Sequence, residues 1–342
     1  MKRNTKPYPT VTLIIITKNV QRTIGTVLKS IQMQKYPKNK VDILVIDGGS
    51  TDGTLDIIKV SKQDITVVQS IYPNDPEACR GVGLQYAKGD VIGFIDSDNY
   101  LPHNHWLENI IVPFTIHKEV VGAQALRYGY RKRDSALNRY FALVGSGDPV
   151  GFYLKKADRL SYLYDRWNLY GKIVHETNAY YLIQFTPDNF PTLGSNAFFA
   201  RKRLLKKAKS DPLHYFHIDV PLDLALLGYN TYAIIKDEII HDTAVSLYAF
   251  LKKRVIYMRL HYDKRAADRR YKVFDPSSIN DRFNLLLFIF FSVTIFQPLF
   301  FSIRGYIKKR DIAWFLHPIF CLSITGAYAI AILFRYGVKR KI

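Results

Sequence analysis

The first two-thirds of the chain alternates short apolar runs with helix-like segments. Thr10–Ile16, Val41–Ile46 and Val91–Ile95 are continuous, largely β-branched runs, as is typical of strands buried on both faces. The other expected elements are helices at Thr23–Gln34, Thr54–Lys62 and Pro76–Ala87 and strands at Ile65–Gln69 and Thr231–Ile235. Strands that alternate with helices predict an α/β domain with a doubly wound, mostly parallel sheet flanked by helices.

Two long apolar stretches stand near the end of the chain, Phe283–Ile303 and Ile312–Phe334. The first holds no charge, and as a helix it would measure about 31 Å, close to the thickness of a bilayer's hydrocarbon core. A short basic loop, Arg304–Asp311, separates the two stretches. We therefore expect residues 282–342 to form a C-terminal transmembrane hairpin in the cell membrane, with spans at about 283–303 and 312–334. The alternative is a pair of buried core helices.

Residues 246–281 precede this hairpin, and Ser246–Tyr271 alternates large apolar side chains with lysines and arginines. The pattern predicts an amphipathic helix at the membrane interface, or else an ordinary surface helix. The flank Lys264–Lys272, the loop and the tail are all basic, which a spanning hairpin cannot reconcile with the positive-inside rule. Either the loop is translocated despite its charge, or one segment is re-entrant or interfacial.

Composition narrows the classes of partner. The chain has 342 residues and a formal net charge of +20, which suits nucleic acid or an anionic membrane surface. No helix-turn-helix, zinc-finger or RNP-type pattern is visible, so we expect no nucleic acid partner. Two cysteines far apart in sequence, Cys79 and Cys321, indicate neither a disulfide framework nor a metal cluster. The pattern carries no prediction of an oligomeric state.

Polar clusters follow the predicted strands at their carboxyl ends, where sheets of this kind bind ligands. They are Thr17-Lys18-Asn19, Asp47–Asp52 and Asp96–Asn99. The carboxylates of Asp96 and Asp98 stand one residue apart, so they repel unless a cation or hydrogen-bond donors compensate. A hard divalent ion prefers oxygen ligands and bridges to substrate phosphates. Tight turns and helix caps are the alternative explanation for each cluster alone.

Taken together, these segments resemble the family 2 glycosyltransferases of GT-A (Rossmann-like) fold, over roughly Pro9–Val245. The matching stretches are VTLIIITKN (Val11–Asn19), VDILVIDGGSTDGT (Val41–Thr54), ACRGVGLQYAKGDVIGFIDSDN (Ala78–Asn99), GSNAFFARKRLL (Gly194–Leu205), LDLALLGYN (Leu222–Asn230) and the later His241. With its apolar C-terminus, the chain resembles membrane-anchored members such as polyprenyl-phosphate sugar synthases and related lipid-linked glycan glycosyltransferases. Residues 1–245 would then be the catalytic domain.

The resemblance implies a role for particular residues. A UDP- or GDP-sugar donor would contact Thr17, Asn19, Asp47, Asp52, Arg80, Asp96 and Ser97. The Mg²⁺ or Mn²⁺ ion on its diphosphate would be held by Asp98 with Asp96, or a water on Asp96, and His241. The acceptor side would include Gly194, Ser195, Asn196 and Arg201, together with an insertion at residues 129–193. The reaction would invert the configuration of the transferred sugar.

The catalytic base is the point of departure from the family pattern. Many members carry an adjacent Glu-Asp before the helix that ends in Gly-Tyr, whereas this chain has Asp219 and Asp223 before Gly228-Tyr229. Asp219 is the first candidate and Asp223 the second, with a helix cap as the alternative for Asp219. A hydroxyl acceptor needs a base, but a phosphate is already ionised near neutral pH. The weak base motif therefore favours a polyprenyl phosphate.

The expected function is an inverting, metal-dependent glycosyltransferase at the cytoplasmic face of the membrane, with a polyprenyl phosphate or lipid-linked glycan as acceptor. One alternative keeps the chemistry but uses a non-lipid glycan or a protein as acceptor. A nucleotidyltransferase lacks support, because no Gly-rich triphosphate loop follows the first strand. The most distant alternative is a membrane scaffold that binds a nucleotide without activity.

Overall fold

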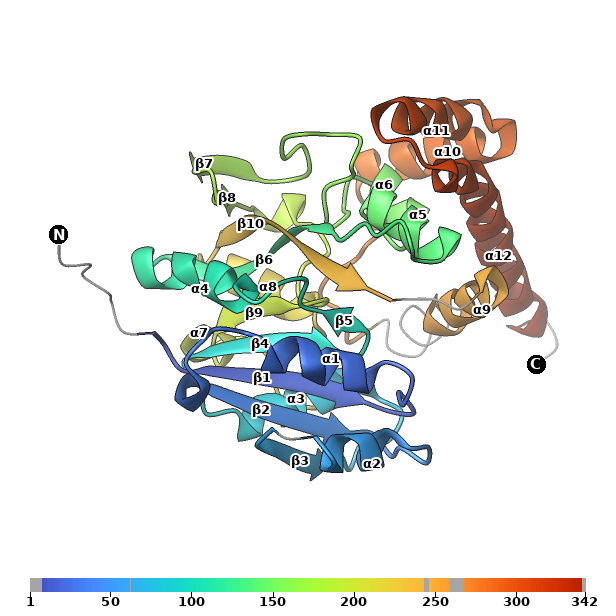
Figure 1. Cartoon of the computed structure of the whole chain (residues 1–342). Helices are drawn as coiled ribbons and strands as arrows, with labels where there is room; N and C mark the ends of the chain where they lie inside the picture. The colour runs from blue at the N-terminus through green and yellow to red at the C-terminus, as the bar shows by residue number, and fades with distance from the viewer. Residues whose placement is uncertain (1–7, 62, 243–245, 259–266, 340–342) are drawn as a thin grey trace. The chain divides into compact units, whose positions relative to one another are not determined.

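A computed structural model describes residues 8–61, 63–242, 246–258 and 267–339 (Figure 1). The chain divides into two compact units. Unit 1 contains Met1–Gly129 and Tyr170–Asp242, and unit 2 contains Tyr130–Leu169 and Thr243–Ile342. The expected insertion at 129–193 is therefore split: its first part belongs to unit 2 with the C-terminal helices, and its second part belongs to unit 1.

Unit 1 is built on one mixed sheet in the order β3-β2-β1-β4-β9-β6-β10-β8-β7, with β5 paired to β10. Its strands are β1 (Val11–Thr17), β2 (Val41–Asp47), β3 (Ile65–Gln69), β4 (Val91–Asp96), β5 (Asn99–Tyr100), β6 (Val120–Tyr128), β7 (Lys172–Glu176), β8 (Tyr180–Gln184), β9 (Phe198–Arg201) and β10 (Thr231–His241). Its helices are α1 (Ile24–Gln32), α2 (Thr54–Lys59), α3 (Pro76–Tyr86), α4 (Trp106–Ile116), α7 (Lys202–Leu205) and α8 (Asp219–Leu226), with 3₁₀ turns η1 (Lys38–Lys40) and η2 (Pro187–Asn189).

The β3-β2-β1-β4 half confirms the predicted doubly wound pattern. Its four strands are parallel, and β1 is almost completely buried between β2 and β4. The chain runs outward from β1 to β3 and then returns to β4 through α3, so the order reverses between β1 and β4. Ligands bind at such a switch point, beyond the carboxyl ends of the strands. Thr17 and Asp96 stand at those ends.

The other half of the sheet is mixed, which the sequence pattern did not predict. β9 lies antiparallel between β4 and β6, and β10 is parallel to β6. The carboxyl ends of β4, β6 and β10 therefore share one edge with the beginning of β9. A register shift between Ile235 and Glu238 interrupts the pairing of β10 with β6, and the end of β10 then pairs antiparallel with β5. This pairing sets His241 opposite Asn99.

Unit 2 is helical, and its core joins the first part of the insertion to the C-terminal segments. The helices are α5 (Ala136–Val144), α6 (Pro149–Tyr153), α9 (Leu247–Met258), α10 (Ile279–Thr294), α11 (Phe296–Lys308) and α12 (Leu316–Lys339), with the 3₁₀ turn η4 (Ile312–Phe315). Phe141 of α5, Phe250 of α9 and Phe320 of α12 contact one another in this core. α9 occupies the start of the expected interfacial helix, of which residues 259–266 lie outside the described residues.

The first apolar stretch is not one helix. Ile295 adopts a left-handed conformation, with a φ of 63°, and α10 and α11 meet there at a bend of 81°. Pro298 explains the break, because a proline four residues after Thr294 removes a helical hydrogen bond and its ring would clash with the Thr294 carbonyl. The structure thus differs from a continuous span over 283–303. Within the described residues, Ile312–Leu333 is long and apolar enough to cross a membrane, and the bent pair passes only if it counts as one span.

Candidate active site

The loop after β2 is organised around the buried carboxylate of Asp47. This side chain accepts hydrogen bonds from the hydroxyl of Thr17 at 2.9 Å and from the backbone amides of Gly49 and Ser50 at 3.0 and 2.9 Å. Burial alone would raise the pKa of Asp47, but these bonds and one from the Ser50 hydroxyl outweigh it and hold the pKa below its ordinary value. Asp47 is therefore an ionised anchor that joins the ends of β1 and β2.

Asn19 and Asp52 tie the loop after β1 to the loop after β2. The Asn19 side chain accepts from the Thr51 amide at 2.8 Å, and its own backbone amide donates to the Ser50 hydroxyl at 3.0 Å. Asp52 accepts from the amides of Gln21 and Thr54 at 3.2 and 3.0 Å. Thr17, Asn19, Asp47 and Asp52, which sequence reasoning gave to the donor nucleotide, are thus brought together in one pair of loops.

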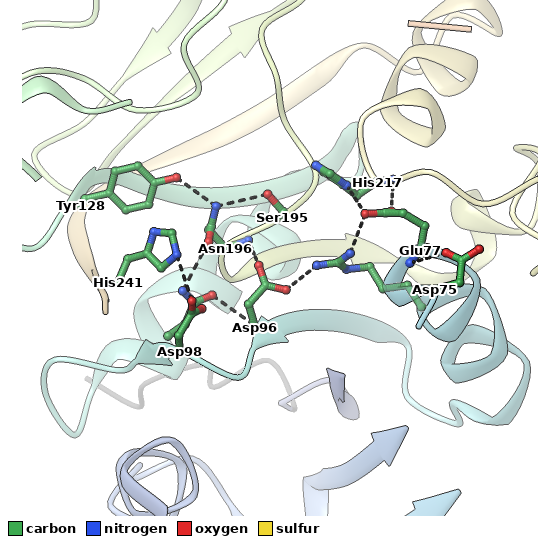
Figure 2. A network of polar contacts seen from close by, with 11 residues as sticks. Asp75, Glu77, Asp96, Asp98, Tyr128, Ser195, Asn196, His217 and His241 are labelled. Atoms are coloured by element: carbon green, nitrogen blue, oxygen red, sulfur yellow. Dashed lines mark hydrogen bonds and ion pairs between the residues drawn. The ribbon is translucent and has the colours of Figure 1, made fainter. Parts of the chain in front are cut away.

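Arg80 connects α3 to the end of β4. Asp75 is the N-cap of α3: its side chain accepts from the amides of Glu77 and Ala78, and Pro76 fits the first turn of the helix. Glu77 and Arg80, three residues apart on this helix, form a buried ion pair at 2.8 Å, and the Arg80 guanidinium also pairs with Asp96. Figure 2 shows Asp96, Glu77 and His217 in one polar network.

The loop before β9 completes the surroundings of Asp96. The Asn196 amide donates to the second carboxylate oxygen of Asp96 at 3.1 Å, and the Asn196 side chain donates to the Tyr128 hydroxyl at 3.0 Å and to the Ser195 hydroxyl at 3.2 Å. Asn196 and Ala197 both have positive φ, at 55° and 62°, a strained conformation for residues other than glycine. The loop conformation that aims this amide at Asp96 therefore depends on its surroundings.

Asp98 lies beside His241, as the resemblance implied. The imidazole Nε2 of His241 is 3.4 Å from a carboxylate oxygen of Asp98, although the residues are far apart in sequence. The antiparallel pairing of β5 with β10 and a 3.0 Å hydrogen bond from the Asp242 amide to the Asp98 carbonyl bring them together. The Tyr128 ring lies against the imidazole, 5.3 Å between centroids.

Asp98 and His241 fit a divalent ion that takes most of its ligands from outside the protein. Asp98 and His241 supply one carboxylate and one imidazole, and the described residues contain no group of three or more His, Cys, Asp or Glu side chains that could hold a metal. Asp96, expected as a further metal ligand, points its two oxygens at Arg80 and at the Asn196 amide instead. An ion at Asp98 would thus complete its shell with diphosphate oxygens and water, as Mg²⁺ commonly does.

The base candidates lie on α8. Asp219 begins this helix and its residue exposure is 0%, so no acceptor reaches it in this conformation. Asp223 accepts a hydrogen bond from the Lys209 amide at 3.1 Å. The Gly194 loop lies against the segment before α8, because a Cβ on Gly194 would sit 1.8 Å from the His217 carbonyl oxygen. Gly194, Ser195 and Asn196 therefore lie between Asp96 and that segment.

The structure does not bring Arg201 to the site. Arg201 pairs with Val91 at the start of β4, the edge of the sheet opposite Asp96. Its guanidinium donates to the carbonyls of Phe114, His117 and Val120 and so closes the end of α4. The expected acceptor role does not fit this position. Ser97 lies in the turn between β4 and β5, next to both acidic residues.

Sequence reasoning missed Glu77, Asn99 and Tyr128. A glutamate in the first turn of a helix reads as a solvated, dipole-compensating residue, yet Glu77 is buried and pairs with His217 at 2.8 Å. Asn99 accepts from the Asp96 amide at 3.1 Å. Tyr128 ends β6, a strand with no distinctive motif. Of these three residues, only Asn99 could have been suspected from the sequence, because it lies in the polar cluster Asp96–Asn99.

Comparisons with known proteins agree with this geometry. Residues 12–182 match the model of the family described as Glycosyl transferase family 2. The glycosyltransferase AglE of Haloferax volcanii is 29% identical over 140 residues, which are 40% of this chain and 45% of that protein. WfaP of Escherichia coli, a UDP-Glc:α-D-GlcNAc-diphosphoundecaprenol β-1,3-glucosyltransferase, is 37% identical over 91 residues, 26% of this chain and 36% of that protein. The matches thus span less than half of these relatives.

A solved structure shares the fold over nearly the whole chain. The mannosyltransferase PcManGT from Pyrobaculum calidifontis, in complex with GDP-Man and Mn²⁺, superposes with a TM-score of 0.51 at 15% identity, over 96% of this chain and 91% of that one. The sheet order and the acidic strand end of this chain therefore sit in a GT-A fold. Because the family model matches half of the chain, the protein belongs to the family 2 glycosyltransferases and is an enzyme of that class.

Proposed function

We propose that the protein transfers a sugar from a nucleotide-sugar to a lipid-linked acceptor at a membrane surface, with a divalent ion bound at Asp98 and His241. The observation that carries the proposal is the edge of the sheet where Asp98 meets His241 beside an Asp96 held by Arg80 and Asn196. It combines a cation site with an ordered loop pair for the nucleotide. UDP- and GDP-sugars are the donors that we propose.

The chain's own residues would divide the work. The loop pair around Asp47 binds and orients the nucleoside, while Arg80 and the Asn196 amide fix the Asp96 carboxylate. Asp98 and His241 would hold Mg²⁺ or Mn²⁺, which neutralises charge on the diphosphate leaving group when it is bound. PcManGT, of the same fold, has been solved with GDP-Man and Mn²⁺, which supports this class of donor and ion.

The acceptor proposal rests on the second unit and on a relative. The outer faces of α10, α11 and α12 expose large apolar side chains, including Phe283, Phe296 and Leu333, as expected of a membrane-bound protein. WfaP, by its name, acts on a diphosphoundecaprenol-linked sugar. A lipid acceptor would reach the active site of an enzyme held at the bilayer. We place the enzyme at the cytoplasmic face.

The state of the base candidates supports an acceptor that is already ionised. Asp219 is fully buried and Asp223 accepts a backbone hydrogen bond. A phosphate acceptor needs no proton removal near neutral pH, whereas a sugar hydroxyl needs a base within hydrogen-bond reach. We therefore prefer a polyprenyl phosphate to a lipid-linked glycan.

The test is transfer by the full chain in detergent with Mn²⁺ or Mg²⁺, offered UDP- and GDP-sugars with and without polyprenyl phosphate. We expect a glycolipid product with one donor, and at least a hundredfold loss of transfer in Asp98→Asn, in line with the loss of an electrostatic stabiliser. Asp188→Asn, an exposed acidic residue on η2, is the matched control and should keep wild-type turnover.

Three other outcomes would change the proposal. Product only with a glycan or protein acceptor would remove the lipid phosphate but keep the sugar transfer. Full activity of Asp98→Asn, or full activity in excess chelator, would remove the metal role. Failure to bind any nucleotide-sugar would leave the membrane scaffold as the better description.

A further inference from the structure

Unit 2 presents an apolar surface that its own core does not explain. Phe283, Phe290, Phe296 and Phe300 on α10 and α11 are exposed, Phe296 to 81%. On α12, Ile319, Leu322, Ile330 and Leu333 are also exposed. Their spacing of three, eight and three residues keeps them on one helical face. Large apolar side chains exposed side by side in this way mark an interaction site.

The bend between α10 and α11 limits how deep this surface reaches. α10 has 16 residues and α11 has 13. At 1.5 Å per residue they are about 24 Å and 20 Å long, each shorter than the roughly 30 Å hydrocarbon core. With a bend of 81° at Ile295, the two arms form a V. Inclined equally, the V descends only about 15 Å, which is one leaflet.

Positive charge stands at both open ends of the V, away from the bend at Ile295. Arg282 stands at the start of α10, and Arg304 and Arg310 stand at the end of α11 and just after it; all three are exposed. Arginine heads at these positions reach the phosphate level of an anionic leaflet while their stems stay in apolar surroundings. Because both ends are basic, both ends belong at the same headgroup level. A through-going span would put one of them on the far side.

α12 is long enough to cross a membrane, but its inner face packs against α9, which carries exposed lysines on its other side. Phe320, near the middle of the apolar stretch Ile312–Leu333, contacts Phe250 of α9, 5.6 Å between ring centroids. Lys252 and Lys253, just beyond Phe250, are exposed. If α12 crossed the bilayer, these two lysines would lie at hydrocarbon depth without protein cover, at a cost of about 3 kcal/mol or more each.

A second polar contact on α12 leads to the same conclusion. The Tyr328 hydroxyl donates to the Asp148 carboxylate at 2.6 Å, and this carboxylate caps α6 through the Val150 amide at 2.9 Å. Tyr328 stands five residues before Leu333, so a spanning α12 would draw Asp148 about 7 Å into the hydrocarbon. α12 thus carries a stripe of exposed apolar residues on one face, while its opposite face packs into the core of unit 2. This arrangement suits a helix that lies along an interface, with the helices packed on it on the water side.

We propose that α10, α11 and α12 form a monotopic insertion surface, which enters a single leaflet rich in anionic lipid and crosses no bilayer. The proposal rests on the membrane association given under the proposed function, and it replaces the transmembrane hairpin expected from the sequence. It also places the basic flank, loop and tail on one side of the membrane, which the positive-inside rule requires and a hairpin forbids.

The test is the sidedness of single cysteines in sealed, inverted membrane vesicles from cells that express the full chain. Val60→Cys on unit 1, Arg310→Cys after α11 and Lys341→Cys in the tail are each labelled with a membrane-impermeant maleimide before and after detergent. The native Cys79 and Cys321 are buried and give the background. We expect all three engineered cysteines to react to the same extent before detergent.

Each other labelling pattern overturns the proposal in a distinct way. Protection of Arg310→Cys alone would mean a spanning hairpin. Protection of Lys341→Cys alone would mean that α12 crosses the membrane. The protein could instead be absent from the vesicles and form dimers in solution that the Phe296→Asp substitution dissociates. That result would mean that a second copy of the chain covers this surface. None of these measurements depends on sugar transfer. The membrane proposal and the proposed activity can therefore be refuted independently of each other.

Binding to preformed vesicles tests the lipid itself. Phe296→Asp, at the apex of the V, should weaken flotation with phosphatidylglycerol-containing vesicles about tenfold or more, because it removes one large apolar side chain from the leaflet. Leu213→Asp, at an exposed leucine of unit 1, is the matched control and should bind as wild type. Arg304→Glu with Arg310→Glu should remove the preference for phosphatidylglycerol over phosphatidylcholine. Equal binding of the apex variant and wild type would refute the insertion.

Discussion

At the residue scale, the site depends on a buried chain of charges behind Asp96. Glu77 lies between two partners: Arg80, which also holds Asp96, and His217, whose backbone amide and ring both contact the Glu77 carboxylate. Burial alone would raise the pKa of Glu77, but His217 and Arg80 more than offset it and lower the pKa far below its ordinary value. Glu77 therefore positions Asp96 indirectly, through Arg80.

Glu77→Gln tests this positioning. Removing one partner of a buried ionic group leaves the others uncompensated, so we expect unfolding to become easier by about 3–5 kcal/mol. A lowered pKa makes the Glu77 contribution complete above the ordinary value of 4.5 and progressively lost as the pH falls below it. The gap in unfolding free energy between wild type and variant should thus shrink below that pH. Denaturant titrations at several pH values measure it, with the exposed Glu119→Gln as control; parallel curves would contradict the assignment.

Asp219 is the second test at this scale. If its carboxylate acts as a base for a hydroxyl, Asp219→Asn should lower transfer to a lipid-linked glycan at least a hundredfold. The same variant should keep transfer to polyprenyl phosphate within a fewfold of wild type. Initial rates with the two acceptors give the comparison, and Asp223→Asn serves as the paired variant. An equal loss with both acceptors would assign Asp219 a structural role at the start of α8.

At the element scale, the loop before β9 links the acidic strand end to α8. Gly194 has a φ of 120°, which side chains rarely allow, and it lies directly against the His217 carbonyl. Asn196 two residues later donates its amide to Asp96. The position of the loop is therefore set by a close backbone contact on one side and by the hydrogen bonds of Asn196 to Asp96 and Tyr128 on the other.

Gly194→Ala should disturb the site through this contact. A Cβ 1.8 Å from the carbonyl oxygen cannot be accommodated without movement of the loop or of residues before α8. We expect a loss of stability of about 2 kcal/mol or more and a larger fractional loss of turnover than of nucleotide affinity. Thermal unfolding and steady-state kinetics measure the two effects. Gly228→Ala also changes a glycine with positive φ, but nothing lies within 4 Å of its Cβ position, so it controls for backbone strain alone.

The elements that the sequence predicted are those whose patterns are local in the chain. β1, β2 and β4 are continuous β-branched runs between recognisable turns, so their existence and the strand-end clusters were predictable. β9 pairs with strands from distant parts of the chain and with opposite direction, which no local pattern encodes. Arg201 was expected on the acceptor side because nothing local shows which edge of the sheet it reaches. The break at Ile295 did have a local signal in Pro298, which overall apolarity obscured.

At the scale of the whole molecule, the insertion and the C-terminal helices are one folding unit. Tyr140 of α5 and Tyr153 of α6 contact the buried His317 of α12 at 3.0 and 3.1 Å, and Lys156 pairs with Asp281 of α10 at 2.6 Å. These contacts join residues more than a hundred positions apart. The C-terminal helices are therefore more than an anchor, because they also complete the core of unit 2.

A truncation at residue 281 should for this reason not yield a soluble enzyme. It would uncover Phe141, Leu143 and Val144, which are buried in the core of unit 2, at roughly 1.5–3 kcal/mol for each side chain returned to water. We expect aggregation on size-exclusion chromatography without detergent. A chain that lacks both 130–169 and 243–342, with a glycine-serine linker after Gly129, removes the whole unit and should stay monomeric and still bind nucleotide-sugar. If the simple truncation is monomeric and stable, unit 2 does not need its C-terminal helices to fold, and the two segments are separate structures.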